Sequence, residues 1–255
     1  MNNIQKIKQS EAKIYNQGYR SSDIMLDKQV MQMILNDCNN WLDDKINQYD
    51  PGSHALVVGC GEGKDAFDLA SRGFKVTAVD ISETRIENAK QKAAKNGIQS
   101  CEFHTGDAED LSIFADSTFD LILCRAILHH LPNFSAVIAQ YPRILKHGGA
   151  VVVQEPGLLN PFAFIRRKFF PTGVHTPDEH PFVPYRFIEL FGSGYSKVDS
   201  RLFCISNLLA PICAKLAGQK VGKSVALPLN MLDRTLTKVP WLRETAWIIS
   251  VHAVK

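Results

Sequence analysis

The chain has 255 residues, of which 45% are hydrophobic and 22% are charged, with 16 Gly and 12 Pro. These proportions are typical of a globular protein, and they exclude a disordered, a collagen-like or a coiled-coil chain. At this length we expect one large domain, or one domain that carries a sizeable insertion, rather than two independent units. The formal net charge of +3 is too small for an electrostatic footprint on nucleic acid, so we expect no nucleic-acid partner.

The cysteine spacing and the apolar runs bear on the compartment. There is no Cys-x-x-Cys motif, so we expect buried thiols in a reducing compartment. Residues 1–15 lack the apolar core of a secretory signal, and the longest uncharged apolar-rich run, residues 202–214, is shorter than the about 20 residues of a spanning helix. We therefore expect a cytoplasmic protein that is not integral to a membrane. The cysteines are Cys38, Cys60, Cys101, Cys124, Cys204 and Cys213.

The first predicted elements surround a glycine-rich turn. Apolar residues recur at helical spacing between residues 26 and 49, which predicts an amphipathic helix. The apolar run of residues 55–58 predicts a strand that is buried on both faces, as in a parallel sheet. Gly59, Gly61 and Gly63 follow it directly and predict a tight turn.

Helices and strands alternate from this turn onward. We expect Ser82 to cap one of the helices and Gly97 to end it. The alternation predicts βαβ units and a doubly wound, mostly parallel seven-stranded α/β sheet. After the first strand, the predicted helices are 65–71, 83–96 and 135–145, and the predicted strands are 75–79, 101–104, 119–124, 150–154, 196–205 and 246–254.

We divide the chain into four segments. Residues 1–28 form an N-terminal helical cover, and residues 29–155 form the ligand-binding core. Residues 156–194 are rich in proline and phenylalanine, which predicts an irregular lid over the carboxyl ends of the strands. Residues 195–255 supply the last strands, with a helical insertion at residues 206–240.

Asp80 and the glycine-rich turn together indicate an adenosine-containing ligand. Asp80 ends the second strand 21 residues after Gly59, where an acidic side chain can accept hydrogen bonds from ribose hydroxyls. The dinucleotide pattern G-x-G-x-x-G requires a third glycine at position 64, which is Lys64 here, whereas the third glycine is Gly63. This spacing disfavours NAD.

The G-x-G-x-G turn followed by Asp80 resembles the class I S-adenosylmethionine-dependent methyltransferases. Four later segments resemble the corresponding family segments, and the His-His pair and the Leu-Lys-x-Gly-Gly segment are most similar to the small-molecule, quinone-biosynthesis-like branch. The resemblance covers roughly residues 30–156. The four segments are Gly106–Leu111, Phe119–Cys124, Leu128–Leu131 and Arg143–Gly149.

The resemblance implies S-adenosylmethionine as cofactor and assigns its contacts. Gly59, Cys60 and Gly61 would line the methionine half. The chain departs from the family at Val57, where an acidic residue usually stands near the methionine amino group. The remaining implied contacts are Asp80 to the ribose, Ile81 against the adenine, Asp107 to the adenine amino group, Ala108 to the ring edge and Cys124 beside the sulfonium.

Three residues are candidates for catalysis. Methyl transfer is an in-line displacement that needs a general base only when the nucleophile arrives protonated. His129, His130 and Glu155 follow the fourth and fifth strands, at the edge where the reactive methyl group should lie. We therefore expect a methyltransferase that acts on a small hydrophobic acceptor, with an O-, N- or C-nucleophile left open.

Other interpretations of the sequence remain alongside this one. A non-catalytic S-adenosylmethionine-binding module and an NAD-dependent oxidoreductase are the alternative functions. We favour a solvated loop over a metal site for a His- and acid-rich stretch, and expect no metal. Tyr15 and Tyr19 could cover the cofactor, and the basic-aromatic stretch of residues 166–170 allows peripheral contact with a membrane. The His- and acid-rich stretch contains His175, Asp178, Glu179 and His180.

Overall fold

The computed structural model describes residues 3–16, 27–169 and 179–255 of the chain. Its centre is a sheet with the strand order β3-β2-β1-β4-β5-β7-β6, in which β1 to β5 run parallel and β7 runs antiparallel to both of its neighbours. The predicted seven-stranded, mostly parallel sheet is confirmed. The strands are β1 His54–Val58, β2 Lys75–Asp80, β3 Cys101–Thr105, β4 Phe119–Arg125, β5 Leu145–Pro156, β6 Lys197–Phe203 and β7 Ile248–Val254.

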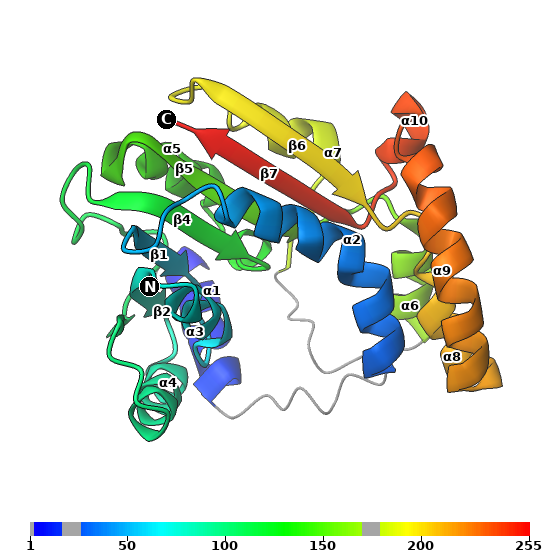
Figure 1. Ribbon diagram of the computed structural model, residues 1–255, viewed down its shortest axis with the longest axis horizontal. Helices are drawn as coiled ribbons and strands as arrows, with labels where there is room; N and C mark the ends of the chain where they lie inside the picture. The colour runs from blue at the N-terminus through cyan, green and yellow to red at the C-terminus, as the bar shows by residue number, and fades with distance from the viewer. Residues whose placement is uncertain (1–2, 17–26, 170–178) are drawn as a thin grey trace.

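Helices cover both faces of this sheet (Figure 1). The buried side chains of β1 alternate between two clusters, because Leu56 and Val58 pack on one face of the sheet and Ala55 and Val57 on the other. This alternation explains why residues 55–58 of β1 are all apolar. The helices are α1 Asn3–Asn16, α2 Lys28–Ile46, α3 Lys64–Ser71, α4 Glu83–Lys95, the short 3-10 helix η2 Leu128–His130, α5 Phe134–Ile144, α6 Pro161–Phe169, α7 Pro184–Glu189, α8 Leu209–Ala217, α9 Gln219–Leu236 and α10 Pro240–Arg243.

The turn between β1 and α3 is left-handed at all three of its glycines, with φ values of 69° at Gly59, 53° at Gly61 and 90° at Gly63. A Cβ atom at Gly59 would lie 2.5 Å from Cγ1 of Ile127, so only glycine fits between the turn and the chain that follows β4. The third glycine, Gly63, is the N-cap of α3, and a Cβ there would meet the ring of Phe67.

Helices α8, α9 and α10 connect β6 to β7, and α8 and α9 lie beside the lower half of α2 (Figure 1). Ala210 of α8 and Ala226 of α9 share a buried cluster with Val30 and Ile34 of α2. The chain from 206 to 240 is thus helical, as the sequence indicates. The helical segment is held to the sheet mainly through α2.

The expectation of an irregular segment at residues 156–194 is wrong where α6 and α7 form. Pro161 is the first residue of α6, a position at which proline does not disturb a helix. The side chain of Asn160 accepts a hydrogen bond from the Ala163 amide (2.9 Å), which caps this helix. Proline content alone therefore does not exclude a helix here.

The expectation of buried thiols holds for four of the six cysteines, because Cys101 and Cys213 are half-buried.

No helix within residues 3–16, 27–169 and 179–255 is both long enough and apolar enough to cross a membrane.

Candidate functional site

A cavity opens where the carboxyl ends of β1, β2, β3 and β4 meet. Its lining comes from the turns that follow these strands and, in addition, from the N-terminal helix α1. This edge is where ligands bind in open α/β sheets. The lining residues are Lys8, Glu11, Tyr15, Gly59, Asp80, Ile81, Arg85, Asp107, Ala108, Ala126, Ile127, His130, Leu131 and Pro132.

Asp80 lies at the centre of this edge and is 7% exposed. Its carboxylate accepts hydrogen bonds from the amide of Gly61 (2.8 Å) and from the amide of Ser82 (2.9 Å). It therefore fixes the glycine-rich turn against the start of α4 while it lines the cavity. The predicted cap is also present, because Ser82 Oγ accepts from the Arg85 amide (3.3 Å).

Asp107 and Ala108 lie at the other side of the cavity, after β3. Lys8 Nζ is 2.6 Å from Asp107 Oδ2 and 2.6 Å from Glu109 Oε2. Although burial works against it, these two carboxylates raise the pKa of Lys8. An adenine amino group at this position would share the Asp107 carboxylate with Lys8. The contact between Lys8 and Asp107 was not expected from the sequence.

The last turns of α1 also contribute to the site. The guanidinium of Arg85 lies 4.0 Å from the ring centroid of Tyr15, and Tyr15 Oη is 3.3 Å from Nε2 of His130. Burial raises the pKa of the Tyr15 phenol, so the hydroxyl stays protonated at neutral pH. Tyr15 thus covers the cavity, as the sequence analysis allowed, whereas Tyr19 lies outside the described residues.

His129 and Glu155 form a buried pair beside the cavity. Nδ1 of His129 is 2.7 Å from Oε2 of Glu155, and Oε1 of Glu155 accepts from the amides of Ile127 and Leu128 at 2.9 Å each. The carboxylate is 1% exposed and the histidine 7%. A carboxylate fixed in this way favours the tautomer in which Nδ1 donates the proton, which leaves Nε2 of His129 as an acceptor.

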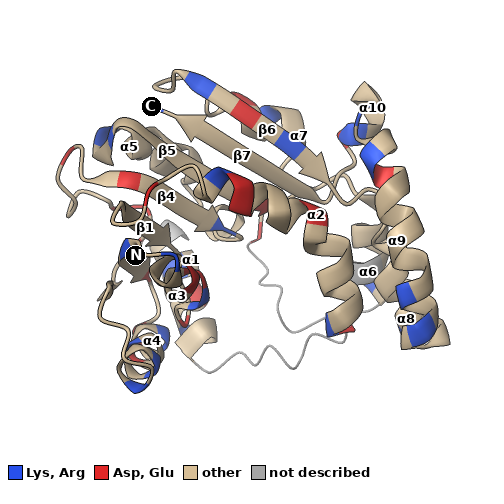
Figure 2. Ribbon diagram, in the orientation of Figure 1, with Lys and Arg blue, Asp and Glu red and all other residues tan. Residues whose placement is uncertain are grey.

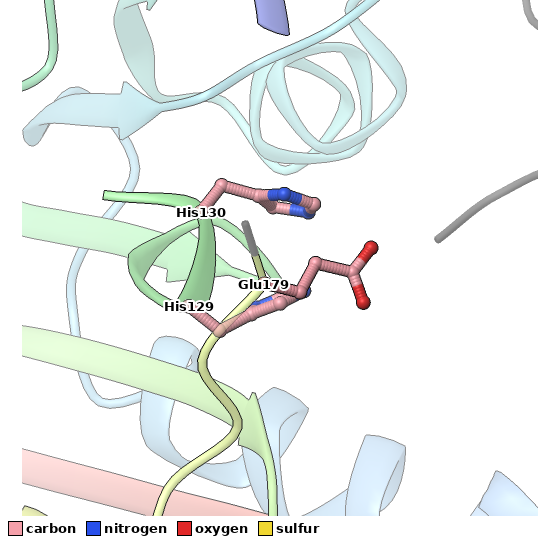
Figure 3. A group of neighbouring side chains, drawn as sticks. All are labelled: His129, His130 and Glu179. Atoms are coloured by element: carbon pink, nitrogen blue, oxygen red, sulfur yellow. The ribbon is translucent and has the colours of Figure 1, made fainter. Parts of the chain in front are cut away.

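His130 and Glu179 lie next to this pair (Figure 3). The His129 and His130 rings are 4.1 Å apart, and one ligand atom from each histidine and from Glu179 can be chosen so that all three lie within 4.8 Å of one another. Two imidazoles and one carboxylate are a donor set that a divalent metal could use. The structure thus brings Glu179 to the site, while His175 and Asp178 lie outside the described residues.

Cys60, Gly61 and Cys124 do not line the cavity. The Cys60 side chain packs into the cluster on the α3 face of the sheet. Cys124 is fully buried on the opposite face, where Tyr141 Oη is 3.5 Å from its sulfur, and burial raises the pKa of its thiol. Contacts of Cys60 and Cys124 with a cofactor would have to come from the backbone.

The residues around the cavity fit an adenosine that carries an extended chain. An acidic side chain is available at each of two neighbouring turns, Asp80 and Asp107, and Ile81 and Ala108 offer apolar surface between them. The glycine floor at Gly59 leaves no side chain to block a close approach of a ligand to the main chain. Gly63 caps α3, and Lys64 stands at the position where a dinucleotide site has its third glycine.

Known proteins show the same domain. A family model described as a methyltransferase domain matches residues 49–175. A ubiquinone biosynthesis O-methyltransferase of Pseudomonas syringae pv. tomato is 36% identical over 112 residues, which are 44% of this chain and 47% of that protein. The chain therefore spans about half the length of the curated relatives that it matches.

Solved structures agree with this match. A SAM-dependent methyltransferase from Methanosarcina mazei shares 28% identity at a TM-score of 0.52, over 61% of this chain and 85% of that one. One from Archaeoglobus fulgidus has 17% identity and a TM-score of 0.60, over 86% and 94% of the two chains, and shows a likeness in fold alone. Residues 49–175 therefore form a class I S-adenosylmethionine-dependent methyltransferase domain, and S-adenosylmethionine is the cofactor of this domain.

Proposed function

We propose that this protein is an O-methyltransferase for a small hydrophobic acceptor and that His129 is its general base. The observation that carries this proposal is the bond between His129 Nδ1 and Glu155 Oε2 (2.7 Å), which leaves Nε2 of the same ring as a proton acceptor. A hydroxyl nucleophile arrives protonated and needs such a base. The relatives named as O-methyltransferases in ubiquinone biosynthesis support the same choice of acceptor atom.

S-adenosylmethionine supplies an electrophilic methyl group when it is bound. Asp80 and Ile81 would hold its ribose and adenine, with Asp107 and Ala108 at the far side of the cavity. His129 Nε2 would take the proton of the acceptor hydroxyl while its oxygen bonds to the methyl carbon and the methyl–sulfur bond breaks, which would leave S-adenosylhomocysteine. Glu155 stabilises the imidazolium that results, because its carboxylate is fixed by two backbone amides.

The segment of residues 156–194 supports a hydrophobic acceptor. It starts directly after Glu155, and it returns to the site where the His180 amide donates to the carbonyl of His129 (2.8 Å). The segment therefore lies beside the proposed base at two points, at its start and at His180. Between them, Leu158, Leu159 and Phe164 are 48%, 47% and 65% exposed, so they offer apolar surface to an acceptor.

Replacing the proposed base tests the function directly. We expect His129→Gln to lower kcat about 100-fold or more on a phenolic acceptor, because general-base catalysis typically contributes at least this much. S-adenosylhomocysteine affinity should stay within about twofold, because His129 does not line the cofactor cavity. Transfer of a radiolabelled methyl group to a panel of phenols and hydroquinones measures kcat, and calorimetry measures the affinity.

His104→Gln is the matched control, because His104 is a half-exposed histidine on β3. Full activity of the His129 variant would exclude His129 as the base. Loss of activity of the unmodified enzyme on treatment with EDTA would instead favour a metal bound by His129, His130 and Glu179. Tight cofactor binding without methylation of any acceptor would favour the non-catalytic module.

A further inference from the structure

Arg125 and Asp65 form an ion pair beside the glycine-rich turn. Nη1 of Arg125 is 3.0 Å from Oδ1 of Asp65, and Nη2 donates to Oδ1 of Asn39 at 3.3 Å. Arg125 ends β4, Asp65 lies in the first turn of α3 and Asn39 belongs to α2, so three separate elements meet at this pair. The Arg125 and Asp65 side chains are 26% and 24% exposed, so a ligand can reach both charges.

The pair lies at the opposite end of the cavity edge from the proposed adenine contacts. Val58 pairs with Cys124, so the next residues along the two strands, Gly59 and Arg125, flank the same point at the carboxyl ends of β1 and β4. Ala126 directly after Arg125 lines the cavity. In the strand order β3-β2-β1-β4, a ligand whose adenosine lies over β3 and β2 extends its other end over β1 and β4.

That other end of the cofactor is an amino acid, which carries an ammonium and a carboxylate on one carbon. Val57 cannot pair with the ammonium, because its apolar side chain is buried in the cluster on the α3 face. Asp65 and Arg125 present one acceptor and one donor group of opposite charge, 3.0 Å apart. The guanidinium has five N–H donors, and its two contacts with Asp65 and Asn39 leave others available.

We propose that Asp65 and Arg125 bind the zwitterionic methionine end of the cofactor. Asp65 accepts hydrogen bonds from the ammonium, and Arg125 donates to the carboxylate while Asn39 holds the guanidinium in place. The inference rests on the assignment of S-adenosylmethionine as cofactor. The pair supplies the charged groups that Val57 lacks, from the end of β4 and the first turn of α3.

The test compares two ligands that differ only at this end. S-adenosylhomocysteine carries the amino-acid group, whereas 5′-methylthioadenosine ends in a methyl group on the same sulfur. We expect Arg125→Gln and Asp65→Asn each to weaken S-adenosylhomocysteine binding about tenfold or more, the usual effect of losing a charged hydrogen bond. The affinity for 5′-methylthioadenosine should change less than about twofold. Arg125→Lys should weaken S-adenosylhomocysteine binding less than Arg125→Gln does, because lysine keeps the positive charge. Calorimetric titration measures each affinity.

Asp68→Asn is the matched control. Asp68 is on the same helix as Asp65, but its Oδ2 pairs with Nη2 of Arg72 (2.7 Å), away from the glycine-rich turn. Equal losses for both ligands, or unchanged S-adenosylhomocysteine binding in variants that melt at the normal temperature, would overturn the proposal. The unmodified protein must also bind S-adenosylhomocysteine more tightly than 5′-methylthioadenosine, and equal affinities overturn the proposal without any variant. Binding of neither ligand by the unmodified protein would overturn the cofactor assignment itself.

Discussion

Asp80 has two tasks in this structure, and both depend on its carboxylate. The two oxygens accept from the amides of Gly61 and Ser82, which holds the turn after β1 to the turn after β2. The same group lines the cavity, where it can accept hydrogen bonds from a ribose. A carboxylate with fixed amide donors needs no rearrangement when a ligand arrives, so it is suited to binding.

Asp80→Ala should weaken S-adenosylhomocysteine binding by more than about 1 kcal/mol, since a ribose would lose its charged acceptor and the turn would lose two contacts. Calorimetry on the folded variant checks this. Glu87→Ala on the exposed side of α4 is the control and should bind normally. An unchanged affinity in the Asp80 variant would remove Asp80 from the site.

Among the helices, α9 carries a buried carboxylate that binds the turn after β6. Asp233, 5% exposed, accepts from the amides of Ile205 (2.9 Å), Ser206 (2.8 Å) and Asn207 (3.2 Å) and from the Ser206 hydroxyl (2.7 Å). These donors belong to the turn between β6 and α8. The carboxylate therefore satisfies backbone groups that would otherwise be buried without partners.

Asp233→Ala should lower the free energy of unfolding by about 3 kcal/mol, because it leaves several buried donors without an acceptor. Urea unfolding followed by circular dichroism measures this change. Lys220→Ala, on the exposed start of the same helix, should leave stability within about 0.5 kcal/mol of the unmodified protein. If the Asp233 variant behaved like the Lys220 variant, the carboxylate would not anchor α9.

Over the whole molecule, the charged residues are dispersed, and the buried His252 makes a defined contact. Figure 2 shows basic and acidic residues interleaved on α2, on α4 and on β6, which agrees with the small net charge. His252 on β7 is an ionisable group inside this fold, 4% exposed, with its Nε2 3.3 Å from Tyr49 Oη. Burial, helped by Lys45, lowers the pKa of His252 to about 4.

This shift predicts a loss of stability in acid. An unfolded histidine titrates near pH 6.5, so the folded state binds fewer protons than the unfolded state between about pH 6.5 and 4. The contribution of His252 is therefore complete above pH 6.5 and is lost as the pH falls toward 4, by about 2–3 kcal/mol in total. Urea unfolding at pH 7, 6, 5 and 4.5 measures the free energy of unfolding. This free energy should decline less with falling pH for His252→Phe than for the unmodified protein. His104→Phe, at a half-exposed position, should decline like the unmodified protein; equal declines for all three proteins would contradict the assignment.

Much of the fold could be predicted because its elements are encoded locally. Buried parallel strands such as β1 and β4 are short apolar runs, and glycines and a capping serine mark where the next elements start. Helix α6 was missed because its prolines suggest a loop, although Pro161 stands at the helix start and Asn160 caps the helix through the Ala163 amide. Lys8 was missed because nothing in the sequence of α1 indicates its partner.

Local sequence patterns specify the order of strands and helices, the glycine-rich turn and the acidic residue at the end of β2, because each depends on neighbours within a few residues. Which polar groups meet depends on the tertiary structure. The fold brings together three pairs that are distant in the sequence. They are Glu155 and His129, 26 residues apart, Arg125 and Asp65, 60 residues apart, and Lys8 and Asp107, 99 residues apart. Such pairs follow from the packing of the sheet, which brings strand ends and α1 together at one edge, and no local pattern specifies them.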